Sequence, residues 1–260
     1  MTAAVGVDVG GTKLAAARVD VERGTILAAR RLPTRPERGP DAVLADCRAL
    51  AAELGGGAAG LAVCELVGPD GRLRSAETVD WRDADLSAFA VVESDVRAAA
   101  LAEARHGVRL PDFLYVSVGT GISHCLIAEG APRVGVRGSA IGTGAPLVEA
   151  WSGGLALARR TGHATAQEAL ADPRCAAVVD DAARRLGLAL AALVNGLDPG
   201  AVVIGGGLGL HDGYRERVET ALRAAVYDPE ARALPVLPAG LGADAPVIGA
   251  AVAAAARAPA

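Results

Sequence analysis

The chain has 260 residues and a formal net charge of −4, and 52 % of its residues are hydrophobic. This apolar content excludes a disordered chain, and the lack of any basic block argues against a nucleic-acid partner. No apolar run is long enough to span a membrane, and the N-terminus has no signal-peptide pattern. The four cysteines lie far apart, which indicates neither a zinc site nor a disulfide framework, so we expect a protein of the reducing cytoplasm.

The first half of the chain predicts a strand hairpin followed by alternating helices and strands. Alternating valines, a glycine turn and a second apolar run indicate the hairpin. Asp41 after Pro40 is the predicted cap of the next helix, which ends at a run of glycines. In chain order the expected elements are strand 5–9, strand 14–19, helix 41–54, strand 60–63, strand 91–92 and helix 95–105.

The second half repeats this order. Its hairpin turns at Gly119-Thr120-Gly121, and Asp172-Pro173 is the predicted start of a long helix. The remaining elements are a buried strand, a last strand and a C-terminal helix opened by Asp244 and Pro246. Their expected ranges are hairpin 113–118 and 122–128, helix 172–195, strand 201–204, a strand around 236 and helix 244–260. The repetition predicts a duplicated α/β fold with two lobes and a cleft between them.

The first glycine turn has the residue types of a phosphate site. Gly10 and Gly11 let the backbone approach an anion closely, and the Thr12 hydroxyl and Lys13 offer a donor and a charge. Asp8 faces away from the neighbouring valines, so its carboxylate can hold Mg²⁺ through water. A plain hairpin turn is the alternative interpretation.

Two further glycine runs strengthen the phosphate interpretation. Gly119, Thr120 and Gly121 repeat the strand, turn and strand arrangement, and a triple glycine follows the buried strand 201–204. That run, Gly205-Gly206-Gly207, precedes a helix, and nucleotides often meet a helix N-terminus at such a position. The P-loop pattern does not occur in the sequence.

With these motifs in place, the whole chain resembles the ROK family of repressors and sugar kinases. The first phosphate motif is Asp8 to Lys13, and the second is Gly119 to Ile122. Glu93-Ser94-Asp95 with the alanines after it is similar to the segment that carries the family's catalytic aspartate. Residues 193–199 and 202–207 resemble the adenosine-side motif.

The resemblance implies a two-lobed, actin-like (ribonuclease H-like) ATPase fold, with lobes at 1–95 plus 246–260 and at 96–245. It implies ATP and Mg²⁺ as cofactors, a sugar-like acceptor and a homodimer. Asp95 is then the general base that takes the proton of the attacking hydroxyl. The alternative for Ser94 and Asp95 is a simple helix cap.

The sugar-binding positions depart from the family pattern. Ser94 stands where relatives have asparagine, and Gly142 and Ala145 stand where they have a glutamate and a histidine. The family's zinc segment is deleted, and the four histidines share no metal spacing. Glu149 resembles a glutamate that contacts sugar in relatives, or else is an exposed residue at a helix start.

Cys64-Glu65-Leu66 replaces the family's proline-glycine-proline near the sugar. Glu65 therefore either faces an amine or a relocated hydroxyl of an amino sugar or cyclitol, or is a solvated loop residue. Three functions follow from these observations. An active carbohydrate kinase is favoured, a catalytically weak sugar sensor or partner protein is the alternative, and a DNA-binding repressor is disfavoured because the first phosphate motif begins almost at Met1. Polyphosphate as the phosphate donor stays open.

Overall fold

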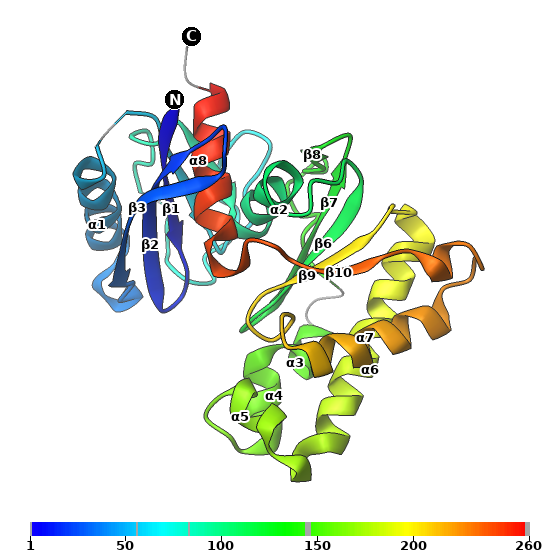
Figure 1. The fold of residues 1–260 in the computed structure, drawn as a ribbon. Coiled ribbons are helices and arrows are strands. Elements are labelled where there is room, and N and C mark those ends of the chain that lie inside the picture. Colours follow the sequence, from blue (N-terminus) through cyan, green and yellow to red (C-terminus); the bar gives the residue numbers. More distant parts are fainter. Residues whose placement is uncertain (1, 56, 83, 144–146, 258–260) are drawn as a thin grey trace. The chain divides into compact units, whose positions relative to one another are not determined.

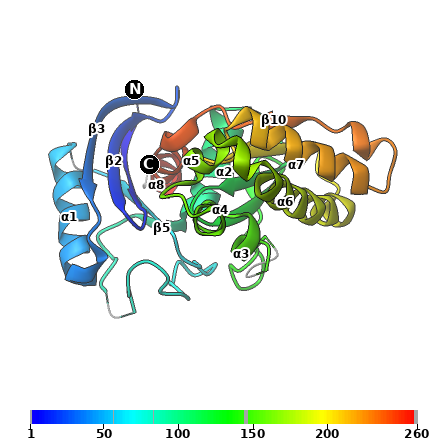
Figure 2. The same ribbon diagram turned by 90° about the horizontal axis from the view of Figure 1, so that it is seen from below.

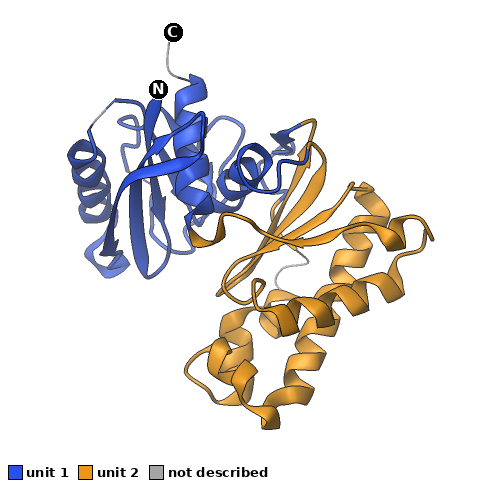
Figure 3. Ribbon diagram, in the orientation of Figure 1, with its two compact units in different colours: residues 1–110, 130–140, 244–260 blue, residues 111–129, 141–243 orange. Residues whose placement is uncertain are grey.

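The computed structural model of the chain describes residues 2–55, 57–82, 84–143 and 147–257. The chain forms two compact units, coloured separately in Figure 3. Unit 1 comprises residues 1–110, 130–140 and 244–260, and unit 2 comprises residues 111–129 and 141–243. Among the described residues no helix combines the length and the apolar character needed to cross a bilayer.

Unit 1 is built on a five-stranded sheet with the order β3-β2-β1-β4-β5. β1, β2 and β3 form an antiparallel meander, whereas β4 and β5 run parallel to β1. The strands are β1 (Ala3–Val9), β2 (Lys13–Asp20), β3 (Thr25–Pro33), β4 (Ala59–Val63) and β5 (Val91–Ser94). Its helices are α1 (Pro40–Glu53), α2 (Asp95–Arg105) and α8 (Ala245–Arg257), and its segment 130–140 contains the short strand β8 (Ala131–Pro132).

Glycines allow α8 to lie unusually close to the sheet and to α2, as the red helix in Figure 1 shows. A Cβ on Gly6 of β1 would lie 1.8 Å from the Val247 carbonyl oxygen, and one on Gly249 would lie 1.8 Å from that of Ala98. No side chain larger than hydrogen fits at such distances. Backbone contact therefore fixes β1 and α2 against the same helix.

Unit 2 repeats strands β2, β1, β4 and β5 of unit 1 in the same order and with the same directions. β6 and β7 form an antiparallel hairpin, and β9 and β10 continue the sheet parallel to β6. The strands are β6 (Phe113–Val118), β7 (Ile122–Ala128), β9 (Val202–Gly205) and β10 (Val236–Pro238). This match confirms the predicted duplicated, actin-like α/β fold.

The helices of unit 2 are α3 (Glu149–Ser152), α4 (Gly154–Thr161), α5 (Ala166–Ala171), α6 (Ala176–Leu197) and α7 (Asp212–Ala225). α6 and α7 pack side by side, which both views show (Figures 1 and 2). One apolar core joins the sheet to these helices through Leu114, Leu157, Leu186, Leu190 and Leu222. Leucine, valine and alanine thus fill the space that aromatic side chains occupy in other proteins.

Several boundaries differ from the sequence prediction. α2 belongs to unit 1, because it packs on α8, whereas the predicted lobe boundary fell at residue 95. Asp41 does not cap α1: Gly39 holds the cap position with φ 84°, and Pro40 is the first helical residue. Asp172 caps a short 3₁₀ turn, and α6 begins only at Ala176.

Candidate active site

The candidate catalytic residues of unit 1 lie at one edge of its sheet. β1, β4 and β5 are parallel, and the register pairs Val9 with Val63 and Val63 with Ser94. The carboxyl ends of the three strands therefore coincide, as they do at ligand sites of other open α/β sheets. Asp8, Cys64 and Asp95 meet there.

Asp95 is the first residue of α2, and its carboxylate is held in place from several sides. Its Oδ1 accepts a hydrogen bond from the Val96 N–H at 2.7 Å and lies 3.5 Å from the Ser94 hydroxyl. Burial raises the pKa of Asp95 to about 6, while hydrogen bonds from Val96, the Cys64 thiol and Ser94 oppose the rise. A carboxylate with this pKa is ionised at neutral pH and still accepts a proton readily, which suits a general base.

Asp8 is the second carboxylate of this edge. Burial, and then the negative charge of Asp95, raise its pKa to about 7, whereas Lys13 lowers it. Two carboxylates so placed repel each other, and a divalent cation offsets such repulsion. The oxygen donors fit Mg²⁺, which prefers carboxylate and water ligands.

Cys64 follows β4 directly and has an exposed position. The charge of Asp95, and then partial desolvation of the sulfur, raise the pKa of its thiol to about 12, while a hydrogen bond with Thr78 lowers it. The thiol therefore stays protonated at neutral pH and donates to Asp95. The sequence prediction singled out Glu65 here and missed Cys64, although its place at the end of a parallel strand is a usable signal.

Glu65 does not point to solvent, and its carboxylate is not free to face a substrate. The residue is only 3 % exposed. Its Oε2 accepts from the Ser75 hydroxyl at 2.5 Å and from the Glu77 N–H at 2.8 Å, and its Oε1 accepts from the Thr78 N–H at 2.8 Å. Both predicted interpretations of Glu65 need correction, because its hydrogen bonds stay within the protein.

Arg97 is a further residue that the sequence analysis did not single out. Its side chain is fully buried on α2, where Glu93 balances its charge at 2.5 Å. The guanidinium donates to the carbonyl oxygens of Val67 at 2.6 Å and of Gly138 at 3.1 Å. Arg97 thus ties two loops of unit 1 to the helix that begins at Asp95.

The first glycine turn is a rigid hairpin. The Gly10 N–H donates to the Lys13 carbonyl at 3.0 Å, and the buried Thr34 hydroxyl donates to the Gly10 carbonyl at 2.6 Å. Gly11, Thr12 and Lys13 are exposed at its tip. The turn therefore presents backbone N–H groups and one ammonium group on a fixed scaffold.

The other two glycine runs come together within unit 2, beside a cavity of about 370 Å³. The Gly154 N–H at the start of α4 donates to the Gly119 carbonyl at 2.8 Å. Gly206 has φ +80°, and a Cβ there would lie 2.5 Å from the Val118 carbonyl oxygen. The cavity is lined by Gly119, Thr120, Gly154, Leu155, Ala158, Ala164, Thr165, Ala166, Gln167, Gly207 and Leu208.

Glu149 opens α3 and packs against the second glycine turn. Its Oε2 accepts from the Ile122 N–H at 2.8 Å, and a Cβ on Gly121 would lie 2.6 Å from the same oxygen. The residue is exposed at the helix start, as one of its two predicted interpretations has it, and its carboxylate is hydrogen bonded to the turn. Gly142 pairs with Ser123 of β7 in an isolated bridge, while Ala145 lies outside the described residues.

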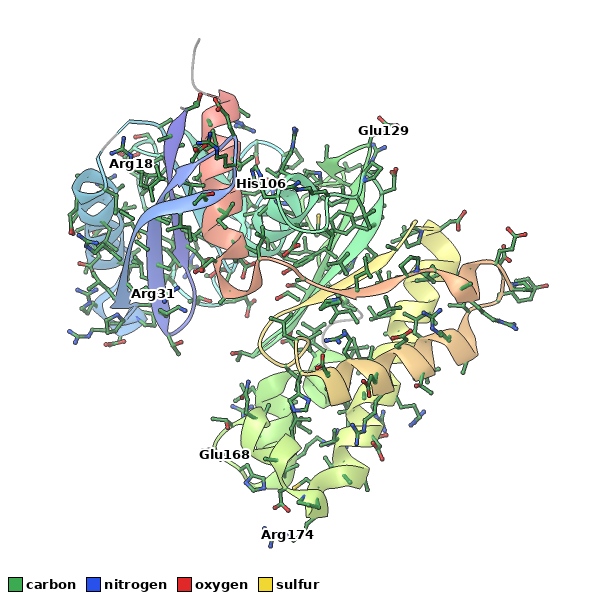
Figure 4. All side chains as sticks on the ribbon, viewed as in Figure 1. Arg18, Arg31, His106, Glu129, Glu168 and Arg174 are labelled. Carbon is green, nitrogen blue, oxygen red and sulfur yellow. The ribbon has the colours of Figure 1, made fainter. Side chains whose placement is uncertain are left out.

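One histidine does come close to potential metal ligands, contrary to the sequence prediction. His163 Nε2 lies 3.1 Å from Asp172 Oδ2, and these atoms and the Cys175 sulfur lie within 4.8 Å of one another. The Asp172 carboxylate, however, is already bound by Arg174 at 2.7 Å. Arg174, labelled in Figure 4, extends from the periphery of unit 2. Asp172 therefore belongs to an ion-pair network that holds the 3₁₀ turn before α6.

The sequence model of the ROK family matches residues 4–150 and 143–257. The chain belongs to the ROK family. Among curated proteins it is 32 % identical over 276 residues to the bifunctional enzyme NanE/NanK of Brucella melitensis. The matched region covers 93 % of this chain and 52 % of that protein. The chain thus spans about half the length of the Brucella relatives that it matches. It is 29 % identical to an N-acetylmannosamine kinase of Escherichia coli O127:H6, over 95 % of this chain and 96 % of that protein.

Solved ROK structures share the fold. A ROK-family glucokinase from Streptomyces griseus, determined with glucose and AMPPNP, superposes with a TM-score of 0.83 and 26 % identity, covering 97 % of this chain and 99 % of that one. A ROK hexokinase from Thermus thermophilus gives a TM-score of 0.79 and 30 % identity over 97 % and 98 % of the two chains. The two-lobed architecture is therefore that of the ROK sugar kinases.

Proposed function

We propose that this chain is an ATP-dependent kinase that phosphorylates a hydroxyl group of a carbohydrate. The observation that carries the proposal is Asp95, a partly buried carboxylate with a pKa of about 6 beside Asp8 and the first glycine turn. A helix cap alone needs no second carboxylate and no raised pKa. The ROK relatives that carry the word kinase in their names support the same activity.

In this proposal the acceptor hydroxyl donates its proton to Asp95 as its oxygen attacks the γ-phosphorus of ATP. The Val96 N–H and the Ser94 hydroxyl keep the carboxylate oriented. The backbone N–H groups of Gly11 and Thr12 and the Lys13 ammonium donate to phosphate oxygens. Asp8 would hold the Mg²⁺ of the nucleotide through water, and that ion supplies charge neutralisation for phosphoryl transfer.

Unit 2 supplies the nucleotide side in this proposal. Its cavity of about 370 Å³ is the size of a nucleoside site, and its walls are small or apolar except for Thr120, Thr165 and Gln167. Gly119, Thr120 and Gly121 form the phosphate end, and Gly205, Gly206 and Gly207 leave space for close approach of the backbone. A solved relative with AMPPNP supports a nucleotide in this fold.

The acceptor we propose is an amino sugar, with N-acetylmannosamine the first to test. Several relatives are named N-acetylmannosamine kinase or, in Listeria monocytogenes, a putative one. Glu65 is hydrogen bonded internally, so it offers no carboxylate to a free ammonium group. A neutral N-acyl group is therefore favoured over a free amine. Glu149 remains a proposed sugar contact, whereas Ser94 is fully buried and its hydroxyl faces Asp95 instead of a sugar. A cytoplasmic homodimer completes the proposal by family resemblance.

A catalytically weak sugar sensor is the second candidate. Gly142 and Ala145 lack the two polar side chains that bind sugar in relatives. Each hydrogen bond to a charged group contributes about 1.5–3 kcal/mol, so the loss of two would weaken glucose binding by roughly two to four orders of magnitude. Glucose itself is therefore a poor candidate for the acceptor.

A coupled ADP-release assay tests the proposal over hexoses, N-acetyl amino sugars, free amino sugars and cyclitols. The kinase function predicts turnover of at least one compound, which Asp95→Asn abolishes and Asp41→Asn leaves unchanged. Asp41 is a suitable control because it is an exposed aspartate in the first turn of α1. Tight sugar binding without ADP release from any compound would instead establish the sensor.

A further inference from the structure

We propose that Glu65 is a positioning residue that builds the acceptor side of the site by holding the segment 75–79 against Cys64 and Asp95. The idea rests on the proposed kinase function. It assigns to Glu65 a role in acceptor binding without contact with the acceptor.

The Glu65 carboxylate is the main hydrogen-bond acceptor of this segment, while Val79 packs in the apolar core and the Ser75 hydroxyl accepts from the Leu66 N–H. Four donors converge on its two oxygens: the Ser75 hydroxyl and the N–H groups of Glu77, Thr78 and Val79, at 2.5 to 3.4 Å. Three consecutive backbone N–H groups aimed at one carboxylate resemble an anion-binding turn whose anion is part of the chain. The segment has no strand or helix hydrogen bonds to hold it otherwise, since no regular element is assigned at 75–79.

Thr78 links this segment to the catalytic residues. Its hydroxyl hydrogen bonds with the Cys64 thiol, which in turn hydrogen bonds with Asp95. On the other side, a Cβ on Gly11 would lie 3.8 Å from the Thr78 methyl carbon. Thr78 therefore stands between the first phosphate turn and the general base. In the proposed reaction the acceptor hydroxyl would approach the phosphate beside Thr78.

The base does not depend on Glu65 in the same way. The Asp95 carboxylate is fixed by the Val96 N–H at 2.7 Å within its own helix start. Loss of the Glu65 hydrogen bonds should therefore loosen the acceptor contacts while the base keeps its orientation. This separation predicts a large change in KM for the acceptor and a small one in kcat.

The test is steady-state kinetics of Glu65→Gln, Ser75→Ala and the control Glu37→Gln. Glutamine replaces one carboxylate oxygen by an N–H₂ group, which cannot accept hydrogen bonds from the backbone N–H groups that face it. The KM for the sugar acceptor should therefore rise about ten- to a hundredfold. We expect kcat to change less than about threefold and the KM for ATP to stay constant. Ser75→Ala removes one of the four donors and should give a smaller rise. Glu37 is exposed on a 3₁₀ turn, and its variant should match the wild type.

Thiol labelling gives a second readout that needs no turnover. Cys64 is exposed, whereas Cys47, Cys125 and Cys175 are buried, so a maleimide reports on Cys64 in the folded protein. Freed from Thr78, Cys64 should label several times faster in Glu65→Gln than in wild type or Glu37→Gln, and Cys64→Ser should abolish the signal. Unchanged labelling together with unchanged acceptor KM would overturn the positioning role, as would a fall in kcat at constant KM. Wild type that turns over no sugar would instead refute the kinase function, and labelling would still decide the role of Glu65.

Discussion

Replacement of Asp8 by asparagine should make the protein more stable and inactive at the same time. Asp8 is a partly buried carboxylate close to Asp95, and its pKa is raised from 3.8 to about 7. Its ionised form is therefore disfavoured in the folded state. Asparagine keeps the shape of the side chain and removes the charge.

The size and the pH window of this effect follow from the pKa values. Between about pH 4 and pH 7 the folded protein keeps the Asp8 proton that the unfolded chain has lost, so stability falls as pH rises through this range. A shift of about three units corresponds to about 4 kcal/mol, at about 1.4 kcal/mol per unit. Below pH 4 both states are protonated, and the cost disappears. Asp8→Asn should therefore unfold at higher denaturant than wild type at pH 8, by about 2–4 kcal/mol, with little difference at pH 4.

Urea unfolding of both proteins at pH 4, 6 and 8, without nucleotide, measures this difference. Asp41→Asn, an exposed aspartate of α1, is the matched control and should show no pH-dependent gain. Mg²⁺ should stabilise wild type more than Asp8→Asn, because the cation loses a carboxylate partner in the variant. A stability difference that is equal at pH 4 and pH 8, or a less stable variant at pH 8, would refute the reasoning.

Three further predictions follow from the geometry. The kcat/KM of wild type should fall about tenfold per pH unit below about pH 6, because only ionised Asp95 accepts the hydroxyl proton; a flat profile from pH 5 to 8 would exclude this base. Gly206→Ala should weaken ATP binding and lower the free energy of unfolding by about 1–3 kcal/mol. The reason is that φ is +80° and that the new methyl group would lie 2.5 Å from a carbonyl oxygen. Calorimetry with ATP measures the change in binding. Gly249→Ala should destabilise unit 1 by at least about 1–3 kcal/mol in urea unfolding, whereas Gly196→Ala, in the open on α6, should be neutral or stabilising by up to about 1 kcal/mol.

Elements with a clear hydrophobic periodicity and with glycine or proline at their ends were predictable from the sequence. Both hairpins, the strand 60–63 and the long helix were found because apolar runs alternate and glycines mark their turns. β3 is not predicted, since it is an edge strand with no fully buried residue, and its second half is exposed at residues such as Arg30 and Arg31. The close approach of α8 to α2 is also not predictable from the sequence. A glycine such as Gly249 lowers helix propensity, and nothing in the sequence indicates that it contacts Ala98.

The candidate site was predictable where chemistry follows local motifs. Asp8 is predicted from its place beside the first glycine turn and Asp95 from the resemblance to the family's catalytic segment, and the structure brings the two residues together. Contacts that depend on chain separation were not predictable. Glu65 meets donors ten to fourteen residues away, and Arg97 meets carbonyls thirty and forty-one residues away. No periodicity marks such pairs, so a buried carboxylate looked like a substrate ligand.

Unit 1 places several polar groups around Asp95. In the segment 140–145, by contrast, the sequence has Gly142 and Ala145 where the family pattern has a glutamate and a histidine. Thr78, Cys64 and Ser94 all lie close to the base or bond to it, and all are neutral. Glu65 and Arg97 are charged, but each is fully engaged inside the protein and supports a loop instead of meeting the acceptor. Neutral hydrogen-bond partners, together with the negative charges of Asp8 and Glu65 nearby, keep Asp95 basic towards a hydroxyl proton, whereas an ammonium group on the acceptor would pair with the carboxylate and lower its basicity. We therefore expect neutral acceptors to be turned over in preference to their free-amine counterparts. Comparison of N-acetylmannosamine with mannosamine at pH 7, where the amine is protonated, measures this preference directly, and faster turnover of mannosamine would contradict it.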